Sequence, residues 1–417
     1  MIVFFICKIY LNVDRLIIMN KILNKIRVLD IGRYVAGPYA ATLLGYMGAE
    51  VIRVEKVSGG EDRYIAPITS GKKNKLNVGG LFMQTGCGKK SITLNLSTER
   101  GRNILKKLAS QVDVVIANIP PKTLKKLGLD WHTFSTNNPK GILVTQTGFG
   151  SKGPDKDKGG FDGVAQAMSG AMYLSGTSDL PVKAGAPYVD FSTAIFSAMG
   201  TLAAIIERNQ TGKGQHVETS LLGTALACMN SHLAEQSVTQ LNRQGTGNQV
   251  QTSAPSDVFK TKDGHILVHT VGDGLFKRWA KLVEREELTD DPLYIGDQAR
   301  GDNRAKLISI MTRWSKSRTT QRALHELQEA GIPSGPILSL QEALDNPQVK
   351  AMNFFTNVSY PGLDSPAPVA RLPIEFSNLN TSITNRPPLL GEHTKEILTS
   401  LKFSKVEIED LRKDGIV

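Results

Sequence analysis

The chain is poor in cysteine and contains no low-complexity segment or internal repeat. Three cysteines, Cys7, Cys87 and Cys228, stand among 417 residues, and their spacing fits neither a disulfide framework nor a metal site. The one close histidine pair, His265 and His269, has no third ligand and is interpreted as core or surface packing. The sequence therefore predicts a protein of the reducing cytoplasm without a metal cofactor.

The chain also lacks the features of a nucleic-acid or membrane protein. Its net charge of +11 would suit nucleic acid, but the lysines are dispersed and no basic run alternates with aromatic residues. The apolar run 1–7 is too short to cross a bilayer, and it has neither the basic start nor the cleavage site of a secretory signal. We expect neither nucleic acid nor membrane as a partner, and a small polyanionic ligand would account for positive charge.

The N-terminal quarter has the pattern of a βαβ unit. Residues 28–32 predict a buried strand, residues 39–47 a helix that Pro38 helps to start, and residues 50–55 a second strand. The alternation continues in strands 89–96, 113–118 and 141–146 and in helix 98–108. The sequence thus predicts an α/β fold with a mainly parallel sheet, in which ligands bind beyond the carboxyl ends of the strands.

Two glycine-rich segments imitate nucleotide-binding loops. Residues 148–153 carry glycines at dinucleotide spacing, but Pro154 and a charged run follow where a helix should begin. Residues 86–91 resemble a phosphate loop, but Lys90 stands where Ser or Thr must reach magnesium. The first βα turn has no such glycine pattern either, so a nicotinamide cofactor is disfavoured.

Asp190 is the candidate for chemistry. It stands at the mouth of a long apolar, small-residue helix pattern that reaches Gly200. An Asp in this place is usually an N-cap, whose carboxylate accepts from N–H groups of the first turn. The same groups could instead orient it as a nucleophile, and burial and the helix start would move its pKa in opposite directions.

Several stretches, in order along the chain, resemble the class III CoA-transferases, whose members include formyl-CoA and carnitine CoA-transferases. They are residues 28–38, 44–56, 88–96, 147–154, 160–170, 184–200 and 211–221. The resemblance implies a Rossmann-like CoA-binding large domain, a smaller α+β domain and an interlocked homodimer. Coenzyme A or acyl-CoA would be a substrate, together with a carboxylic acid.

The family's catalytic aspartate falls on Asp190. The resemblance implies that this carboxylate attacks a donor acyl-CoA, forms a mixed anhydride and is then converted to an aspartyl-CoA thioester. The acceptor acid would run these steps backwards. A carboxylate is a weak nucleophile in water, so this role needs positioning and partial desolvation.

The family's CoA contacts fall on or near eight further residues. They are Val35, Ala36, Lys56, Leu94, Asn118, Ile119, Lys126 and, beside a family contact, Lys158. The lysines are candidate partners for the phosphates of CoA, and the alternative for each is a solvated surface lysine. Residues 85–88 and Ile119 depart from the family pattern, which leaves the adenine contacts open.

Two alternatives remain at this point. A 2-methylacyl-CoA racemase of the same superfamily would use a His and an Asp as its acid/base pair. This chain has Phe161 where the His would stand, so half of that machinery is missing. A non-catalytic acyl-CoA binding protein would keep the basic contacts and lose the nucleophile.

The resemblance also divides the chain. We expect residues 1–18 to be a non-native or disordered extension before Met19, and residues 19–222 to be the first part of the large domain. Residues 223–335, with a hairpin at 256–269, are expected as the small domain, and residues 336–417 as a return to the large one. Residues 245–253 lack the glycine run of formyl-CoA transferases, so formate and oxalate are disfavoured. Succinyl-CoA as donor and a short or branched dicarboxylic acid as acceptor remain a hypothesis.

Overall fold

A computed structural model describes residues 21–68, 78–379, 381–383 and 385–417. The expected extension 1–18 lies outside the described residues, and so does Cys7. The chain divides into two compact units. Unit 1 comprises the residues up to Ser169, Gly185–Ser231 and Asn353–Val417, and unit 2 comprises Gly170–Ala184 and His232–Met352.

Unit 2 differs from the expected small domain, 223–335, at both ends and by the added segment 170–184. This segment belongs to unit 2 because its backbone is bonded there. The carbonyl of Gly176 accepts from the N–H of Gly247 at 2.7 Å, and Thr177 forms a β-bridge with Thr246.

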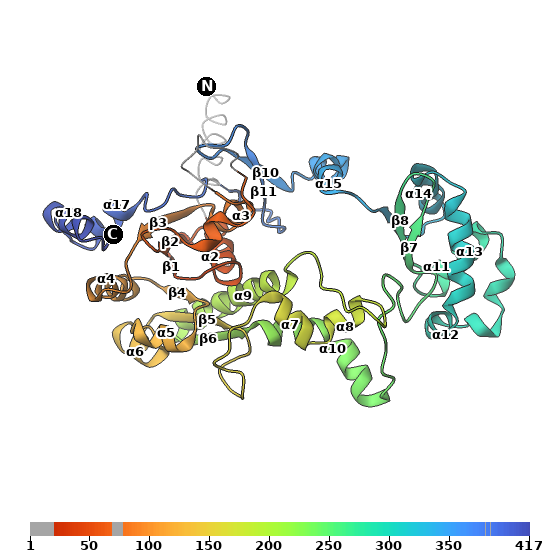
Figure 1. Ribbon diagram of the computed structural model, residues 1–417, viewed down its shortest axis with the longest axis horizontal. Coiled ribbons are helices and arrows are strands. Elements are labelled where there is room, and N and C mark those ends of the chain that lie inside the picture. The colour runs from red at the N-terminus through yellow and green to blue at the C-terminus, as the bar shows by residue number, and fades with distance from the viewer. Residues whose placement is uncertain (1–20, 69–77, 380, 384) are drawn as a thin grey trace, which may run out of the picture. The chain divides into compact units, whose positions relative to one another are not determined.

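A six-stranded parallel sheet forms the centre of unit 1 (Figure 1). Its strands are β1 (Arg27–Asp30), β2 (Glu50–Glu55), β3 (Lys89–Thr93), β4 (Val114–Ala117), β5 (Ile142–Thr147) and β6 (His216–Ser220). Their order is β3-β2-β1-β4-β5-β6. The predicted α/β fold with a parallel sheet is confirmed, while β6 was not predicted as a strand.

Successive side chains of the strands point to opposite faces, and helices cover both faces. On one face, Val28 packs in a core with α2 (Ala36–Tyr46), α3 (Gly80–Gly86) and α9 (Tyr188–Thr211). On the other, Leu29 packs in a core with α4 (Glu99–Ala109), α5 (Pro121–Lys126), α6 (Trp131–Asn137), α17 (Thr394–Ser400) and α18 (Lys405–Lys413). The remaining elements of this unit are η1 (Glu61–Tyr64), α7 (Asp162–Met168), the first part of α10 (Leu221–Thr239), β10 (Phe355–Val358) and β11 (Ala367–Ala370).

Helix α9 is long and apolar enough to cross a bilayer by length and composition. In unit 1 it packs instead against α2, β5 and β6. Its buried face is made of small side chains such as Ala194, Ala198 and Ala204, which allow a close approach to the sheet. The apolar composition of α9 is thus partly explained by its place in the core.

Unit 2 has a three-stranded antiparallel sheet of β7 (Asp257–Lys260), β8 (His265–Val268) and β9 (Ser334–Pro336). Trp279 and Phe276 lie in its core, with α11 (Asp273–Leu282), α13 (Arg304–Lys316) and α14 (Thr320–Glu329) around them. Shorter elements are α8 (Ala171–Ser175), η2 (Glu286–Thr289), η3 (Pro292–Tyr294), α12 (Asp297–Asp302), α15 (Leu340–Asp345) and α16 (Pro347–Ala351). The predicted hairpin at 256–269 is confirmed as the β7–β8 pair.

Neither glycine-rich segment forms a nucleotide-binding loop. After β5 the chain runs from residue 148 to residue 161 without a helix, and α7 begins only at Asp162. Residues 87–88 lead from a helix, α3, into a strand, β3, which is the reverse of a phosphate loop. Both exclusions made from the sequence are confirmed.

Candidate active site

A cavity of about 1390 Å³ lies at the carboxyl ends of the strands of unit 1. Its wall includes residues that follow β1, β2, β3 and β4, namely Ile31, Lys56, Leu94 and Asn118. Strands β1 and β4 are neighbours at the middle of the sheet, and the chain continues from them to opposite edges. Ligands of open parallel sheets bind at such a reversal, and the cavity lies where the sequence predicts a ligand.

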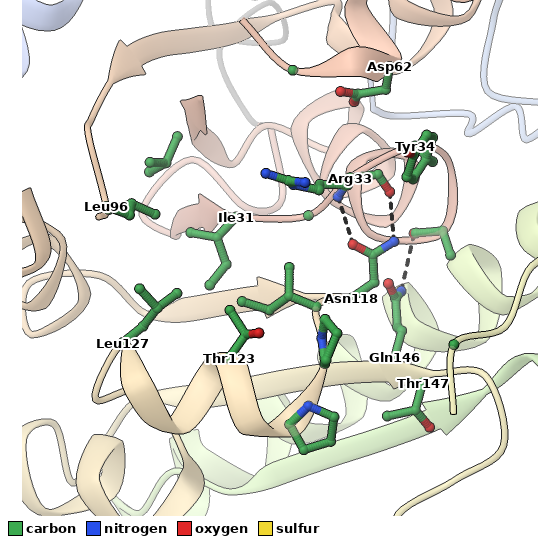
Figure 2. A pocket seen from close by; sticks show the side chains of 18 of the residues that line it. Ile31, Arg33, Tyr34, Asp62, Leu96, Asn118, Thr123, Leu127, Gln146 and Thr147 are labelled. Carbon is green, nitrogen blue, oxygen red and sulfur yellow. Dashed lines mark hydrogen bonds between the residues drawn. The ribbon is translucent and has the colours of Figure 1, made fainter. Parts of the chain in front are cut away.

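The turn between β1 and α2 is fixed by a side chain from the end of β4. The Oδ1 of Asn118 accepts from the N–H of Arg33 at 2.7 Å, and its Nδ2 donates to the carbonyl of Arg33 at 2.7 Å (Figure 2). Gly37 makes this approach possible, because a Cβ there would lie 3.2 Å from the Asn118 amide. The same turn holds Tyr34 at φ 60°, in the left-handed region.

The structure brings all nine residues predicted from the sequence into the wall of this cavity. They are Val35, Ala36, Lys56, Leu94, Asn118, Ile119, Lys126, Lys158 and Asp190. Val35, Ala36 and Leu94 are buried and give the cavity an apolar floor, whereas the three lysines are exposed. Asn118 uses both ends of its amide on the backbone of Arg33, so it shapes the turn. Contact of these residues with CoA stays a prediction.

Positive charge gathers along the exposed part of the wall. Lys56 is paired with Glu61, and Lys158 is paired with Asp155 at 2.6 Å. Lys126 also lines the cavity, and no ion pair joins it to another described residue. Four further cations of the wall were missed by the sequence analysis: Arg33, Arg102, Lys156 and the buried Arg53. The wall can therefore neutralise a ligand with several negative charges.

An aromatic pair forms another part of the wall. The rings of Tyr34 and Phe161 meet edge to face with their centroids 5.5 Å apart. Phe161 is 60% exposed and borders the cavity. A phenyl ring carries no proton that could be exchanged near neutral pH, so the acid/base pair of a racemase lacks one member in this cavity.

Asp190 is the third residue of α9 and lines the same cavity. The sequence pattern suggested a helix cap, but the N-cap position is occupied by Pro187. Among the described residues, no hydrogen bond ends on the Asp190 carboxylate. Burial and the neighbouring charge of Asp162 raise the pKa of Asp190 from 3.8 to about 7. The expectation that this Asp caps its helix is therefore wrong, since its carboxylate lies in the first turn without a backbone partner.

The cap of α9 comes from another helix. Asp162, the first residue of α7, is only 6% exposed, and its Oδ2 accepts from the N–H of Val189 at 2.8 Å and of Asp190 at 3.2 Å. Its Oδ1 accepts from Nε2 of Gln166 at 2.5 Å. Sequence analysis missed this function because the carboxylate lies 28 residues before the N–H that it binds.

A polar side chain of β5 ties two helices together at the cavity. Nε2 of Gln146 donates to the carbonyl of Ala36 in α2 at 3.1 Å and to Oγ of Ser197 in α9 at 2.7 Å. Gln146 is buried, and its Oε1 has no hydrogen-bond partner among the described residues. Gln146 stands between Thr145 and Thr147 at the polar end of β5, so the local sequence pattern does not distinguish it.

Buried charges support the cavity from the strand side. Burial alone would raise the pKa of the Asp30 carboxyl, but Lys89 and Arg53 hold it below its ordinary value. Nζ of Lys89 lies 2.7 Å from Asp30 and also donates to the carbonyl of Pro38 at 2.7 Å. Glu55 is paired with Arg63 at 2.6 Å. These contacts fix the ends of β1 and β2, where the cavity begins.

No metal chemistry is indicated by the described part of the chain. Within it, no group of three or more His, Cys, Asp or Glu side chains could hold a metal ion. Cys87 is buried and Cys228 is exposed, and both are free thiols.

Comparison with known proteins agrees with this geometry. The chain is 32% identical over 404 residues to succinyl-CoA:glutarate CoA-transferase of Mus musculus, covering 95% of this chain and 90% of that one. It is also 32% identical over 389 residues to succinyl-CoA–D-citramalate CoA-transferase of Chloroflexus aurantiacus, covering 91% and 94%. Among solved structures, a CAIB/BAIF family protein from Brucella suis matches with a TM-score of 0.80 and 31% identity, covering 92% of this chain and 100% of the other.

The family model described as CoA-transferase family III matches residues 23–394, which include the cavity and Asp190. The resemblance noted from the sequence is therefore confirmed. Together with the two transferases of similar length, this match shows that the chain is an enzyme and belongs to the CoA-transferase family III.

Proposed function

We propose that this enzyme transfers CoA from an acyl-CoA to a carboxylic acid through covalent adducts on Asp190. The observation that carries the proposal is the position of Asp190 in the wall of the cavity that also holds the predicted CoA contacts. Its carboxylate is half-buried and has no hydrogen-bond partner among the described residues, which leaves its lone pairs available. A carboxylate with a pKa of about 7 is also a stronger base than an ordinary Asp, and nucleophilicity rises with basicity.

The proposed reaction has four steps, in which CoA leaves as thiolate and attacks again. An oxygen of the Asp190 carboxylate attacks the thioester carbonyl of the donor, the C–S bond breaks and CoA leaves as thiolate. The thiolate then attacks the carbonyl carbon of Asp190, and the donor acid leaves as a carboxylate. The acceptor carboxylate attacks the resulting Asp190 thioester, again releasing thiolate. Attack of the thiolate on the acceptor's carbonyl gives the new acyl-CoA and restores Asp190.

The cavity would hold CoA by its two ends. We assign the phosphates to the exposed cations, above all Lys126, because it need not break an ion pair with another described residue to bind them. Lys56 and Lys158 would exchange Glu61 and Asp155 for phosphate oxygens. The apolar floor of Val35, Ala36 and Leu94 suits the pantetheine chain, and the first βα turn would guide it towards Asp190.

Succinyl-CoA is the donor that we propose, with a short or branched dicarboxylic acid as acceptor. The support is that two similar enzymes of the family are named for succinyl-CoA and for glutarate or D-citramalate. Succinate, glutarate and citramalate each carry a second carboxylate. A wall rich in cations can accommodate this extra negative charge.

We further propose that the enzyme is a homodimer, interlocked as the family resemblance implies. Helix α9 has an apolar surface outside the core: Ile195 is 54% exposed, Met199 59% and Ile206 62%. Exposed apolar residues gathered on one helix favour a contact with another protein surface, and a second copy of the chain would cover them.

We also propose that the enzyme acts in the cytoplasm. The three cysteines of the sequence show no disulfide spacing, which supports a reducing compartment.

The test is a screen of donors and acceptors followed by mass spectrometry. The enzyme is incubated with succinyl-CoA and each of a panel of mono- and dicarboxylic acids, and new acyl-CoA species are identified by mass. The Asp190→Asn variant is expected to form none while remaining folded. Full exchange activity in that variant would refute the assigned mechanism. Loss of α-chirality in a 2-methylacyl-CoA without exchange would favour a racemase, and binding without either reaction would favour a CoA-binding protein.

A further inference from the structure

The first turn of α9 is stabilised from outside its own sequence. Pro187, at the N-cap position, makes no side-chain hydrogen bond, so the first N–H groups of the helix depend on another partner. Asp162 supplies it, with one oxygen that accepts from the N–H groups of Val189 and Asp190. This carboxylate is buried, and its other oxygen accepts from Gln166. The position of Asp190 is thus tied to the position of Asp162.

This arrangement also determines which groups are left for the Asp190 carboxylate. The N–H groups of the first turn would stabilise a carboxylate at the helix start if they were free. Two of them are bonded to Asp162, so the side chain of Asp190 receives a like charge nearby in place of these donors. The backbone of Asp190 is therefore held in place by Asp162. Its carboxylate, which is proposed to attack the thioester, receives no hydrogen bond from the first turn of its own helix.

Other charged groups do not replace Asp162 in this role. The elements packed against α9 contribute several titratable side chains in unit 1: Tyr39 and Tyr46 from α2, His216 and Glu218 from β6, Asp162 from α7, and Cys228 from α10. β5 contributes none. His216 is bonded to Oγ1 of Thr145, and Glu218 accepts from the N–H of Ser151. After burial, the neighbouring charge of Asp162 is the cause of the raised pKa of Asp190.

We propose that Asp162 is a positioning residue for the transferase reaction, which holds the first turn of α9 and keeps its N–H groups away from the nucleophile Asp190. This inference rests on the proposed role of Asp190. Asp162 itself touches no reacting atom in the proposed steps. Its carboxylate acts through the backbone of Val189 and Asp190 and through its charge. The raised pKa of Asp190 agrees with this arrangement.

The test compares two substitutions of Asp162 with a matched loss of a helix cap elsewhere. Asp162→Ala removes both the cap and the charge, and a nucleophile displaced by about 1 Å is expected to lower kcat about 100-fold with KM for succinyl-CoA nearly unchanged. Asp162→Asn keeps an oxygen that can accept from Val189 and Asp190. We expect it to lower kcat less than Asp162→Ala does and, by removing the like charge, to move the acidic limb of the kcat/KM profile to lower pH.

Asp130→Ala is the control, because Asp130 caps α6 through the N–H of Thr133 and lies outside the cavity wall. It is expected to lose stability as Asp162→Ala does, but to keep the wild-type kcat and pH profile. A pH profile of Asp162→Asn that coincides with the wild type, or a wild-type kcat in Asp162→Ala, would overturn the positioning role.

A separate measurement distinguishes this failure from failure of the proposed function. Wild-type enzyme is incubated with succinyl-CoA, treated with hydroxylamine and digested, and the peptide containing Asp190 is examined for a hydroxamate by mass spectrometry. A wild-type enzyme that turns over but gives no adduct refutes the covalent mechanism. An adduct in the wild type combined with an unchanged Asp162→Asn profile refutes the positioning role alone.

Discussion

Replacing Asp190 by Asn is expected to abolish exchange and, at the same time, to stabilise the protein. Burial and Asp162 raise the pKa of Asp190 from 3.8 to about 7, so the folded protein resists the charge on this side chain. At about 1.36 kcal/mol for each pH unit, this difference corresponds to at most about 4 kcal/mol. Since solvent reaches part of the carboxylate, we expect about 2 kcal/mol in the free energy of unfolding.

The sign of the effect follows from proton binding. Between pH about 4 and 7 the folded state holds the Asp190 proton more tightly than the unfolded state does, so the wild type loses stability as pH rises through this window. Asn carries no charge, so the variant does not lose this part of its unfolding free energy as pH rises. The advantage of Asp190→Asn should therefore be near zero at pH about 4, grow with pH, and stay constant above pH about 7.

Urea unfolding at a series of pH values, at one protein concentration, measures this difference. Asp364→Asn, at an exposed position, is the control for loss of a carboxylate at the surface. If Asp190→Asn shows no advantage over the wild type at pH 8, or an advantage that does not change with pH, the carboxylate is not desolvated in the folded protein. Asp190 would then not be a nucleophile activated by desolvation, even if the variant were inactive.

Three further predictions concern the rest of the cavity. Lys126→Ala is expected to raise KM for succinyl-CoA about tenfold with little change in kcat, because it removes one charged contact worth about 1.5 kcal/mol; an unchanged KM would exclude Lys126 from phosphate binding. Asn118→Ala should loosen the β1–α2 turn, and we expect about 2 kcal/mol less stability together with a higher KM, measured by urea unfolding and initial rates. Asp30→Ala leaves Lys89 buried without its ion-pair partner and should cost about 3–5 kcal/mol of unfolding free energy, whereas a loss below 1 kcal/mol would contradict the buried pair.

The sheet and the cavity location were predictable because they depend on local patterns. The predicted strands 50–55 and 113–118 correspond to β2 and β4 within a residue, because both contain adjacent β-branched residues, which favour strands. Parallel strands bring their carboxyl ends to one edge, so a ligand site could be expected there, whereas Val35 and Lys126 were assigned to it from the family resemblance. Strand β6 was missed because His216, Glu218 and Thr219 interrupt the apolar pattern.

Two contacts could not be predicted in the same way: the cap of α9 by Asp162, and the hydrogen bonds of Asn118 to the turn between β1 and α2. Both are single side chains that bind backbone far away along the chain: Asp162 binds Val189, and Asn118 binds Arg33 across 85 residues. No periodicity connects such positions. For this reason Asp190 looked like an N-cap, whereas the structure gives that task to Asp162 and leaves Asp190 inside the first turn.

Three unusual features of unit 1 meet at the cavity that contains Asp190. Tyr34 adopts a left-handed conformation that disfavours a bulky side chain, α9 begins without a cap of its own, and two carboxylates approach one another at its start. The left-handed conformation of Tyr34 and the proximity of two carboxylates each cost on the order of 1–3 kcal/mol, whereas the missing cap of α9 is replaced by Asp162. Stable folds avoid such features where nothing requires them. Here Asn118 fixes the β1–α2 turn, and Asp162 caps α9. Their presence around one carboxylate argues that the fold keeps Asp190 open to a ligand and short of hydrogen-bond donors.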